Sequence, residues 1–310
     1  MKIGVSSYCY QKLLNGGQMS LEEAIAFTAE TGFEAIEFTD DRVPKEGDPI
    51  EWARRTGELC KKNGLEVSLL AVWADFINNE NEVERVKRQV DVCAALGAKL
   101  MRHDATWGFR APEYGRRSFQ DALKIVAPAI REVTEYAATR GVRTMCENHG
   151  FFMQDSYRME ALVQAVNHEN FGLLVDVGNF ACADEPSEKA VAAVAPYAFH
   201  AHVKDFLYKP GTMSAPDNSW FDTRGGNHLR GTILGHGVIP VKQCIDILRR
   251  AGFDGTLSLE FEGMEDPREA VRRGCAFIEG ACAKRSPANA LICMNVHKIF
   301  MQRSHGVGIL

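Results

Sequence analysis

Four side chains that could bind a metal each stand at the end of a short apolar run. Glu147 follows the run 142–146, Asp176 ends GLLVD, His202 follows FHA, and Glu260 follows TLSL. Three carboxylates and one imidazole make a mixed oxygen and nitrogen donor set, which suits Mn²⁺, Mg²⁺, Co²⁺ or Zn²⁺. We expect one divalent ion at these residues, with the choice among the four metals left open.

Each of the four residues also has an ordinary structural interpretation. Asp176 could cap a helix, Glu147 or Glu260 could pair with a lysine, and His202 could be a hydrogen-bonded core histidine. Together, however, four such groups at the ends of four strands would bring buried like charges close to one another. These charges repel unless a cation or protons neutralise them. The joint pattern therefore favours a metal site.

The elements that position these residues alternate strictly between strand and helix. A capping box, Ser20 followed by Glu23, starts the first full helix, and glycine precedes most of the strands. Strict alternation indicates a parallel sheet, and eight repeats indicate closure into a single (β/α)8 barrel, the TIM barrel fold, over residues 1–282. We expect strands at 2–5, 33–39, 65–72, 99–103, 142–146, 172–177, 198–203 and 256–261, and helices at 21–31, 51–62, 82–96, 118–140, 157–167, 187–194, 241–251 and 267–282.

The spacing of the candidate ligands agrees with this barrel. Glu147, Asp176 and His202 follow one another at intervals close to the roughly 30 residues of one βα unit. Catalytic groups of such barrels gather at the C-terminal ends of the strands, where all four residues are expected. The step from His202 to Glu260 is longer by about one extended loop, residues 207–237.

Two segments lie outside this simple pattern. The expected loop 207–237 is long enough for a lid or an oligomer contact, and its Arg224, His228 and Arg230 would suit a phosphate or a carboxylate, although the chain has no GxxxxGK phosphate loop. Residues 283–310 form a C-terminal extension whose role the sequence leaves open. It could cover the bottom of the barrel, make dimer contacts or be an appended segment.

Several further residues are candidates for binding a substrate. Alternate residues of a strand face the same side, so Lys204 shares an inward face with His202, as Met145 does with Glu147. Position alone suggests His149 and His103, and core packing is an equally good explanation of His103. The aromatic residues Trp73, Trp107 and Phe109 follow two strands and could wall a sugar pocket or pack in the core.

The segments ENHG, LLVDVGN, HAHVKD and LSLEFEG in this order resemble the strand ends of the sugar phosphate isomerase/epimerase family, which has xylose-isomerase-like TIM barrels. The resemblance implies a single divalent metal on Glu147, Asp176, His202 and Glu260. It also implies that the two glutamates are the proton-transfer pair of a cis-enediolate mechanism on a small sugar, ketose or polyol derivative. Asn179 is a departure, because many members carry a histidine there, which puts its substrate contact and any second metal in question.

Other functions compete with an isomerase or epimerase. Barrels that resemble this one dehydrate inososes or dehydroshikimate, because an enediolate can also expel a β-hydroxyl group. A nuclease resembling endonuclease IV would need about nine ligands for three metals, and the residue at Asn179 disfavours it. A non-catalytic sugar-binding barrel with a purely structural metal is the alternative from another class.

The composition narrows the partners. The chain has 310 residues, of which 45% are hydrophobic, and a formal net charge of −5, which disfavours nucleic acid as a partner and favours a small molecule. Nine cysteines without a CxxC pair are typical of reduced thiols, so we expect a cytoplasmic protein. The sequence lacks an apolar run of ~18 residues and a signal-like start, which predicts no membrane span. A homo-oligomer is possible on this composition.

Overall fold

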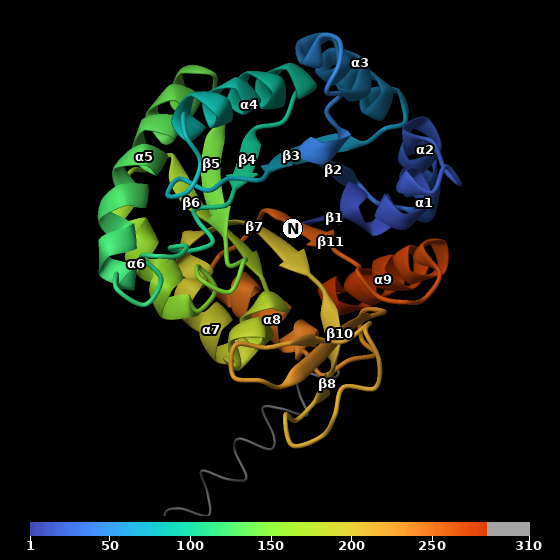
Figure 1. The fold of residues 1–310 in the computed structure, drawn as a ribbon. Coiled ribbons are helices and arrows are strands. Elements are labelled where there is room, and N and C mark those ends of the chain that lie inside the picture. Colours follow the sequence, from blue (N-terminus) through green and yellow to red (C-terminus); the bar gives the residue numbers. More distant parts are fainter. Residues whose placement is uncertain (284–310) are drawn as a thin grey trace, which may run out of the picture.

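The computed structural model describes residues 1–283, and its centre is a closed barrel of eight strands (Figure 1). Around the barrel the order is β1, β11, β7, β6, β5, β4, β3 and β2, and every neighbouring pair is parallel. The predicted (β/α)8 fold is therefore confirmed. The strands are β1 (Lys2–Ser6), β2 (Ala35–Thr39), β3 (Glu66–Val72), β4 (Leu100–His103), β5 (Arg143–Glu147), β6 (Phe171–Asp176), β7 (Ala198–Val203) and β11 (Thr256–Leu259).

The helices form a ring outside the strands, as Figure 1 shows. Among the described residues, none of them is long and apolar enough to cross a membrane. Eight correspond to predicted helices, and the short α1 is an addition. They are α1 (Gln11–Asn15), α2 (Leu21–Thr31), α3 (Pro49–Lys62), α4 (Glu82–Leu96), α5 (Phe119–Thr139), α6 (Ser156–Val166), α7 (Ser187–Val194), α8 (Val241–Arg250) and α9 (Pro267–Cys282).

Local sequence signals set the ends of these helices. Ser20 Oγ accepts a hydrogen bond from the backbone N–H of Glu23 (3.1 Å), and the Glu23 carboxylate accepts one from the N–H of Ser20 (2.7 Å), which completes the predicted capping box at α2. The same helix ends at Gly32, whose φ of 103° is left-handed and costs glycine little. The glycine thus stops α2 shortly before β2 begins.

The strands bury one face against the helices and the other inside the barrel. The outward face joins the large apolar core beneath the helical ring. The inward face forms a separate small cluster of Leu69, Ala71, Met145 and Leu174, with Leu100 and Phe199 packed beside it. Because side chains alternate along a strand, the inward face that begins with Met145 and Leu174 continues to Glu147 and Asp176. The apolar cluster is therefore the floor of the candidate site.

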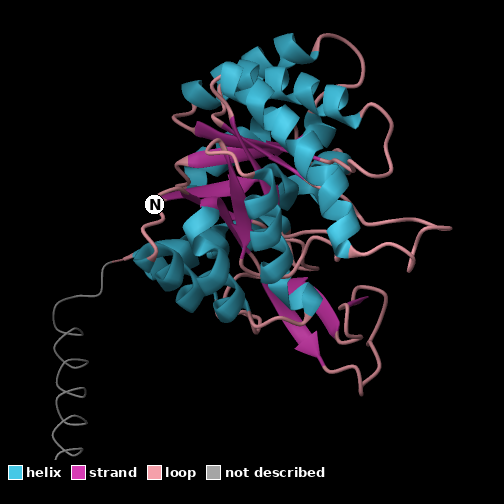
Figure 2. Ribbon diagram, turned by 90° about the vertical axis from the view of Figure 1, so that its left-hand side faces the viewer, coloured by secondary structure: helices cyan, strands magenta, loops and turns pink. Residues whose placement is uncertain are grey.

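The prediction of an irregular loop at 207–237 was wrong. The segment contributes to an antiparallel sheet in the order β8 (Asp205–Lys209), β10 (His228–Thr232) and β9 (Phe221–Asp222), which Figure 2 shows below the barrel. Phe206 and Leu229 are fully buried on its covered face. These strands are short, and the segments between them contain Gly, Pro and Ser. The alternation of apolar and polar residues that predicts a strand was therefore weak. The remaining expected extension, 284–310, lies outside the described residues, and its role stays a prediction.

Close approach of α3 to α4 depends on Gly57. A Cβ at this position would lie 2.4 Å from the backbone carbonyl oxygen of Leu96, whereas a Cβ at Gly280 in α9 would meet nothing within 4 Å. We predict that Gly57→Ala destabilises the protein by about 1–3 kcal/mol through overpacking. Gly280→Ala, the matched control, should stabilise it by up to about 1 kcal/mol through helix propensity. Urea unfolding monitored by circular dichroism measures both, and equal stability of the two variants would contradict the close helix contact.

Candidate metal centre

The structure brings the four predicted ligands together at the C-terminal ends of their strands. Glu147 is the last residue of β5, Asp176 is the last of β6, and His202 lies opposite Asp176 in β7. Glu260 follows β11 directly, and its N–H donates to the carbonyl of Val203 (3.0 Å). One donor atom from each of the four lies within 4.8 Å of the other three. Four strands therefore converge on one point.

The donor atoms surround a space that hydrogen bonds do not fill. His202 Nδ1 lies 3.6 Å from Glu147 Oε1, 3.9 Å from Asp176 Oδ2 and 3.7 Å from Glu260 Oε1. These distances are too long for hydrogen bonds. His202 Nδ1 is buried without a hydrogen-bond partner, a costly state for a polar atom, and Asp176 Oδ2 makes no aligned hydrogen bond and has only the Lys204 ammonium beside it, at 3.1 Å. Three oxygens and one nitrogen that face one another in this way fit a divalent cation.

The electrostatics of the cluster also favour a cation. Burial, together with the negative charges of Glu260 and Glu147, raises the pKa of Asp176 to about 7. Lys204 offsets part of this charge, with Nζ 3.1 Å from Asp176 Oδ2 and in direct contact with Glu260. Burial alone would lower the pKa of His202, but Glu37 and Glu260 raise it well above its usual value. A cation bound among the carboxylates would replace these protons.

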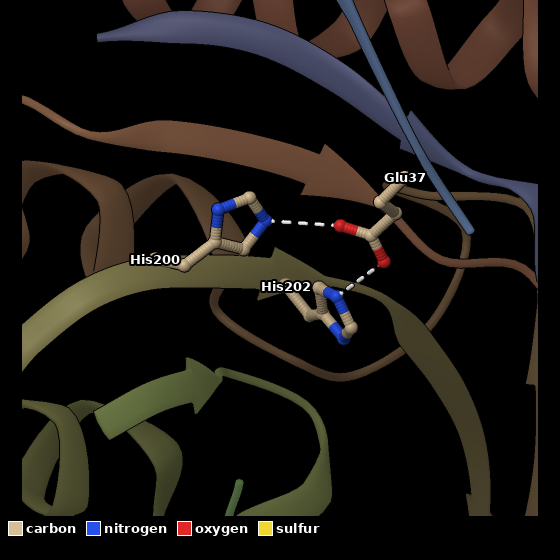
Figure 3. Close-up of side chains that lie close together, drawn as sticks. All are labelled: Glu37, His200 and His202. Carbon is tan, nitrogen blue, oxygen red and sulfur yellow. Dashed lines mark hydrogen bonds and ion pairs between the residues drawn. The ribbon is translucent and has the colours of Figure 1, made fainter. Parts of the chain in front are cut away.

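Glu37, the third residue of β2, bridges the side chains of His200 and His202 (Figure 3). Glu37 Oε1 lies 2.7 Å from His202 Nε2, and Oε2 lies 3.0 Å from His200 Nε2. With its Nε2–H donated to Glu37, His202 turns Nδ1 toward the three carboxylates, and such carboxylate contacts fix the orientation of metal-binding histidines. Glu37, His200 and His202 also lie close enough to resemble a second metal group. Their facing atoms are already hydrogen-bonded to one another, so they support the first group instead.

A second network reaches Glu147 from β4. Arg102 is buried, with its Nη2 2.6 Å from Glu147 Oε2 and 2.9 Å from Asp104 Oδ1. Burial disfavours the charged form of Glu147, but Arg102 and His202 hold the pKa of this carboxyl well below its usual range. Asp104 Oδ1 also lies 3.0 Å from His149 Nδ1. Glu147 is thus an ionised carboxylate with a fixed orientation.

Above the centre lies a cavity of about 200 Å³. Of the predicted site residues, Glu147, His202, Glu260, His149, Lys204 and Trp73 line it. Asn179 lies behind this wall, where its Nδ2 donates to Glu147 Oε1 (3.0 Å). Asn179 is therefore placed to orient a ligand rather than to face the cavity.

His103 does not line the cavity. Its ring is fully buried between Phe76 and Phe171, with centroids 5.5 and 6.3 Å away, and its Nδ1 lies 2.9 Å from the carbonyl oxygen of Asp104. Burial lowers the pKa of His103 to about 4. Its neighbour Arg102 faces the cavity instead, because adjacent strand residues face opposite sides.

The aromatic residues after β3 and β4 behave differently from one another. Trp73 and Trp107 stack with centroids 5.8 Å apart, nearly half of each is exposed, and both meet the ring of His149 edge-on. Phe109 is buried. The tryptophan pair is therefore an apolar wall beside the cavity, suited to the C–H face of a sugar ring.

Sequence reasoning missed Glu37, Arg102 and Asp104. A detectable signal existed for each of the first two. Glu37 is a lone acid inside the apolar strand AIEF, and Arg102 shares its strand face with Leu100, an inward residue. Only the folded barrel shows that Asp104 meets both Arg102 and His149.

Comparison with known proteins places the chain in a family. Residues 25–281 match the family model described as the xylose isomerase-like TIM barrel, and the protein belongs to this family. An inosose dehydratase of Geobacillus thermodenitrificans (strain NG80-2) is 21% identical over 285 residues, which covers 86% of this chain and 91% of the relative.

Two solved structures share the fold. The IOLI protein with a bound zinc atom has a TM-score of 0.70 at 16% identity, covering 91% of this chain and 98% of its own. D-psicose 3-epimerase, solved in the presence of D-fructose, has a TM-score of 0.67 at 15% identity, covering 91% and 99%. The fold is thus shared with an epimerase and with a protein that binds zinc.

The geometry around His202 predicts how metal affinity responds to mutation. We expect about one Mn²⁺ per chain in titration calorimetry, and His202→Ala should abolish this binding. Glu37→Gln should weaken it by roughly 10–100-fold, because the partner that orients His202 loses its charge. Ser258→Ala is the control: Ser258 lies beside His202 on the neighbouring strand, but its Oγ is hydrogen-bonded to His200 Nε2 (3.0 Å), so affinity should hardly change. Wild-type affinity in a folded Glu37→Gln variant would show that Glu37 does not position the ligand.

Proposed function

We propose that this protein is a divalent-metal-dependent isomerase or epimerase of a small ketose or other polyol-derived ketone. The observation that carries the proposal is the placement of two glutamates on either side of one cation position. Glu147 reaches it from β5 and Glu260 from β11, with His202 on β7 between them. Two carboxylates that approach one point from different strands can address the two faces of a substrate bound there.

A divalent ion held by the four ligands would polarise a carbonyl oxygen of the substrate and stabilise the enediolate that proton removal leaves. Glu147 is prepared for the role of base, because Arg102 and His202 keep it ionised. Glu260 begins the cycle protonated and returns its proton on the other face, after which Lys204 contacts the carboxylate that is left. Exchange with solvent then removes the proton from Glu147 and restores the one on Glu260. Return to the same carbon is epimerisation, and return to the neighbouring carbon is isomerisation.

A dehydratase is the second candidate, favoured by the inosose dehydratase that matches 86% of the chain. The first step is the same proton removal beside the carbonyl. The C–O bond at the β carbon then breaks, and the departing hydroxide takes a proton and leaves as water. His149 lines the cavity and is paired with Asp104, so it is the residue placed to give that proton.

A nuclease and a non-catalytic barrel have less support than either enzyme. The cavity opens above a compact centre, the net charge is −5, and Asn179 contacts Glu147 rather than a further metal ligand, which together disfavour a nuclease. A non-catalytic sugar-binding barrel would bind metal and ligand without exchanging a C–H proton.

We propose a small sugar or polyol as the partner, and a cytoplasmic location on the grounds of the reduced cysteines.

The glutamate pair supplies the decisive test. Glu147→Gln and Glu260→Gln keep an oxygen that can reach the metal but cannot accept a carbon-bound proton. Turnover should fall by roughly 10²–10⁴-fold in each, as is typical of losing a general base. In D2O with Mn²⁺, NMR should show each variant exchanging deuterium into only one of the two epimers.

The control for this test is Glu66→Gln. Glu66 is the first residue of β3, at the opposite end of the barrel, so the substitution should leave turnover unchanged. Two-sided exchange in both glutamine variants would assign proton transfer to another base. A product that has lost water, seen by mass spectrometry, would replace the isomerase by the dehydratase.

A further inference from the structure

The charges around the cavity bear on the kind of substrate it accepts. Among the described residues that line it are five carboxylates and two ammonium or guanidinium groups, Arg102 and Lys204. The carboxylates are Glu37, Asp41, Glu147, Glu260 and Glu262. Asp176 adds a sixth just beneath. Even with a divalent ion bound on His202 and the carboxylates, six negative charges face four positive ones, and a protonated His149 would be offset by Asp104 at 3.0 Å.

Within the described part of the chain, neither of these two cations is free for an anionic substrate. Arg102 lies between Glu147 and Asp104, at 2.6 and 2.9 Å. Lys204 contacts Glu260, lies 3.1 Å from Asp176, and has Glu262 at 3.8 Å. A phosphate or carboxylate that approached either cation would have to displace a carboxylate that belongs to the metal centre.

The mouth of the cavity adds acidic and neutral groups. Asp41 is exposed and Glu262 is partly exposed there, beside the neutral Tyr8, Gln11 and Thr39. The Arg42 guanidinium contacts the Asp41 carboxylate, so Glu262 is the stronger source of negative charge at the mouth. Burial and, to a smaller extent, the negative charges of Glu262 and Glu260 raise the pKa of Tyr8 to about 12, so its hydroxyl group stays neutral. Carboxylates accept hydrogen bonds from hydroxyl groups and repel anions.

The basic residues that the sequence suggested for an anion lie elsewhere. Arg224 pairs with Asp155 (2.8 Å), His228 with Asp222 (2.6 Å), and the Arg230 guanidinium lies 5.5 Å from the ring centre of Trp220. None of the three is among the lining residues.

One lysine lies close to the mouth without lining the cavity. Lys12 lies in a smaller hollow that shares Tyr8 and Glu262 with the cavity, and its Nζ donates to the carbonyl of Gly263 (2.5 Å). The ammonium group keeps its positive charge and two further N–H donors, but Lys12 is not among the residues that line the cavity.

The size of the cavity sets a further limit. Its volume of about 200 Å³ lies below the ~300–1,000 Å³ of pockets that hold drug-sized ligands. A single sugar ring or short open chain is of the right scale, with hydroxyl groups on the rim carboxylates and an apolar face on Trp73.

We infer that the substrate is an uncharged polyhydroxy ketone, a free ketose or a keto-cyclitol, and not a sugar phosphate or sugar acid. This inference rests on the proposed function, because it assumes that this cavity binds the reacting ketone.

The test compares matched neutral and anionic probes on the Mn²⁺-loaded protein. The neutral probes are D-fructose and an inosose, and the anionic probes are D-fructose 6-phosphate and a keto-gluconate. Solvent-deuterium exchange by NMR and binding by tryptophan fluorescence are measured for each. We expect kcat/KM and affinity to be at least ~10-fold higher for a neutral probe, because like charges in a binding site oppose association.

Charge can be separated from shape in two ways. Added salt screens exposed charges, so it should raise the affinity of the anionic probes and leave that of the neutral probes nearly unchanged. Glu262→Gln should likewise raise the affinity of the anionic probes and so reduce the difference in affinity between neutral and anionic probes. The remote Glu66→Gln should leave this difference unchanged. If neither salt nor Glu262→Gln changes the difference in affinity between neutral and anionic probes, the charge argument is overturned.

The outcomes distinguish this inference from the proposed function. Preferred exchange of an anionic probe would overturn the inference and leave the isomerase or epimerase standing. Preferential binding of the neutral probes without exchange would support the inference and remove the catalytic function. Binding of neither class to the metal-loaded protein would overturn both.

Discussion

Repulsion among Glu147, Asp176 and Glu260 is the constraint on which the rest of this site depends. The three carboxylates are brought within reach of one another in a buried place, where charge is poorly solvated. Two cations, Arg102 and Lys204, offset only part of this charge from the flanks, and the pKa of Asp176 is raised to about 7. A divalent ion in the middle would complete the neutralisation, which is why the arrangement indicates a metal centre.

Inside the barrel, the residues that support the candidate metal centre and the residues that form it lie in successive layers. The lowest inward layer is apolar and includes Met145 and Leu174, which fill the lumen. Above it, Glu37 connects His200 and His202 by hydrogen bonds, so the ligand histidine is held by a strand on the far side of the barrel. The metal ligands form the next layer, and the variable mouth comes last. The orientation of the His202 side chain therefore depends on hydrogen bonds and packing from other strands of the barrel.

This layering suits a family with several reactions. Proton removal next to a carbonyl needs only the centre and its glutamates, and both an epimerase and a dehydratase begin with it. Under the proposed function, the second step would depend on which group gives the proton back, Glu260 on the carbon or His149 on a departing hydroxide. Asp41 and Glu262 at the mouth would act earlier, on which ketones enter. Reaction and substrate would then be determined by different residues around one centre.

Much of this protein was predictable, because the relevant patterns are local. Alternation along one strand placed Glu147 above Met145, and glycine stops and capping boxes marked the βα units.

Contacts between distant strands were not predictable in this way. Glu37 and His202 are 165 residues apart in the sequence. Whether Arg102 or His103 lines the cavity depended on which face of β4 turns inward. The small sheet around β10 was also missed. The sequence alone determined the eight repeating units and the four candidate ligands at the strand ends, because periodicity and turn chemistry act within about ten residues of the chain. The tertiary structure decided the partners of those ligands and the charge of the cavity, because both arise only where barrel closure brings separate strands face to face.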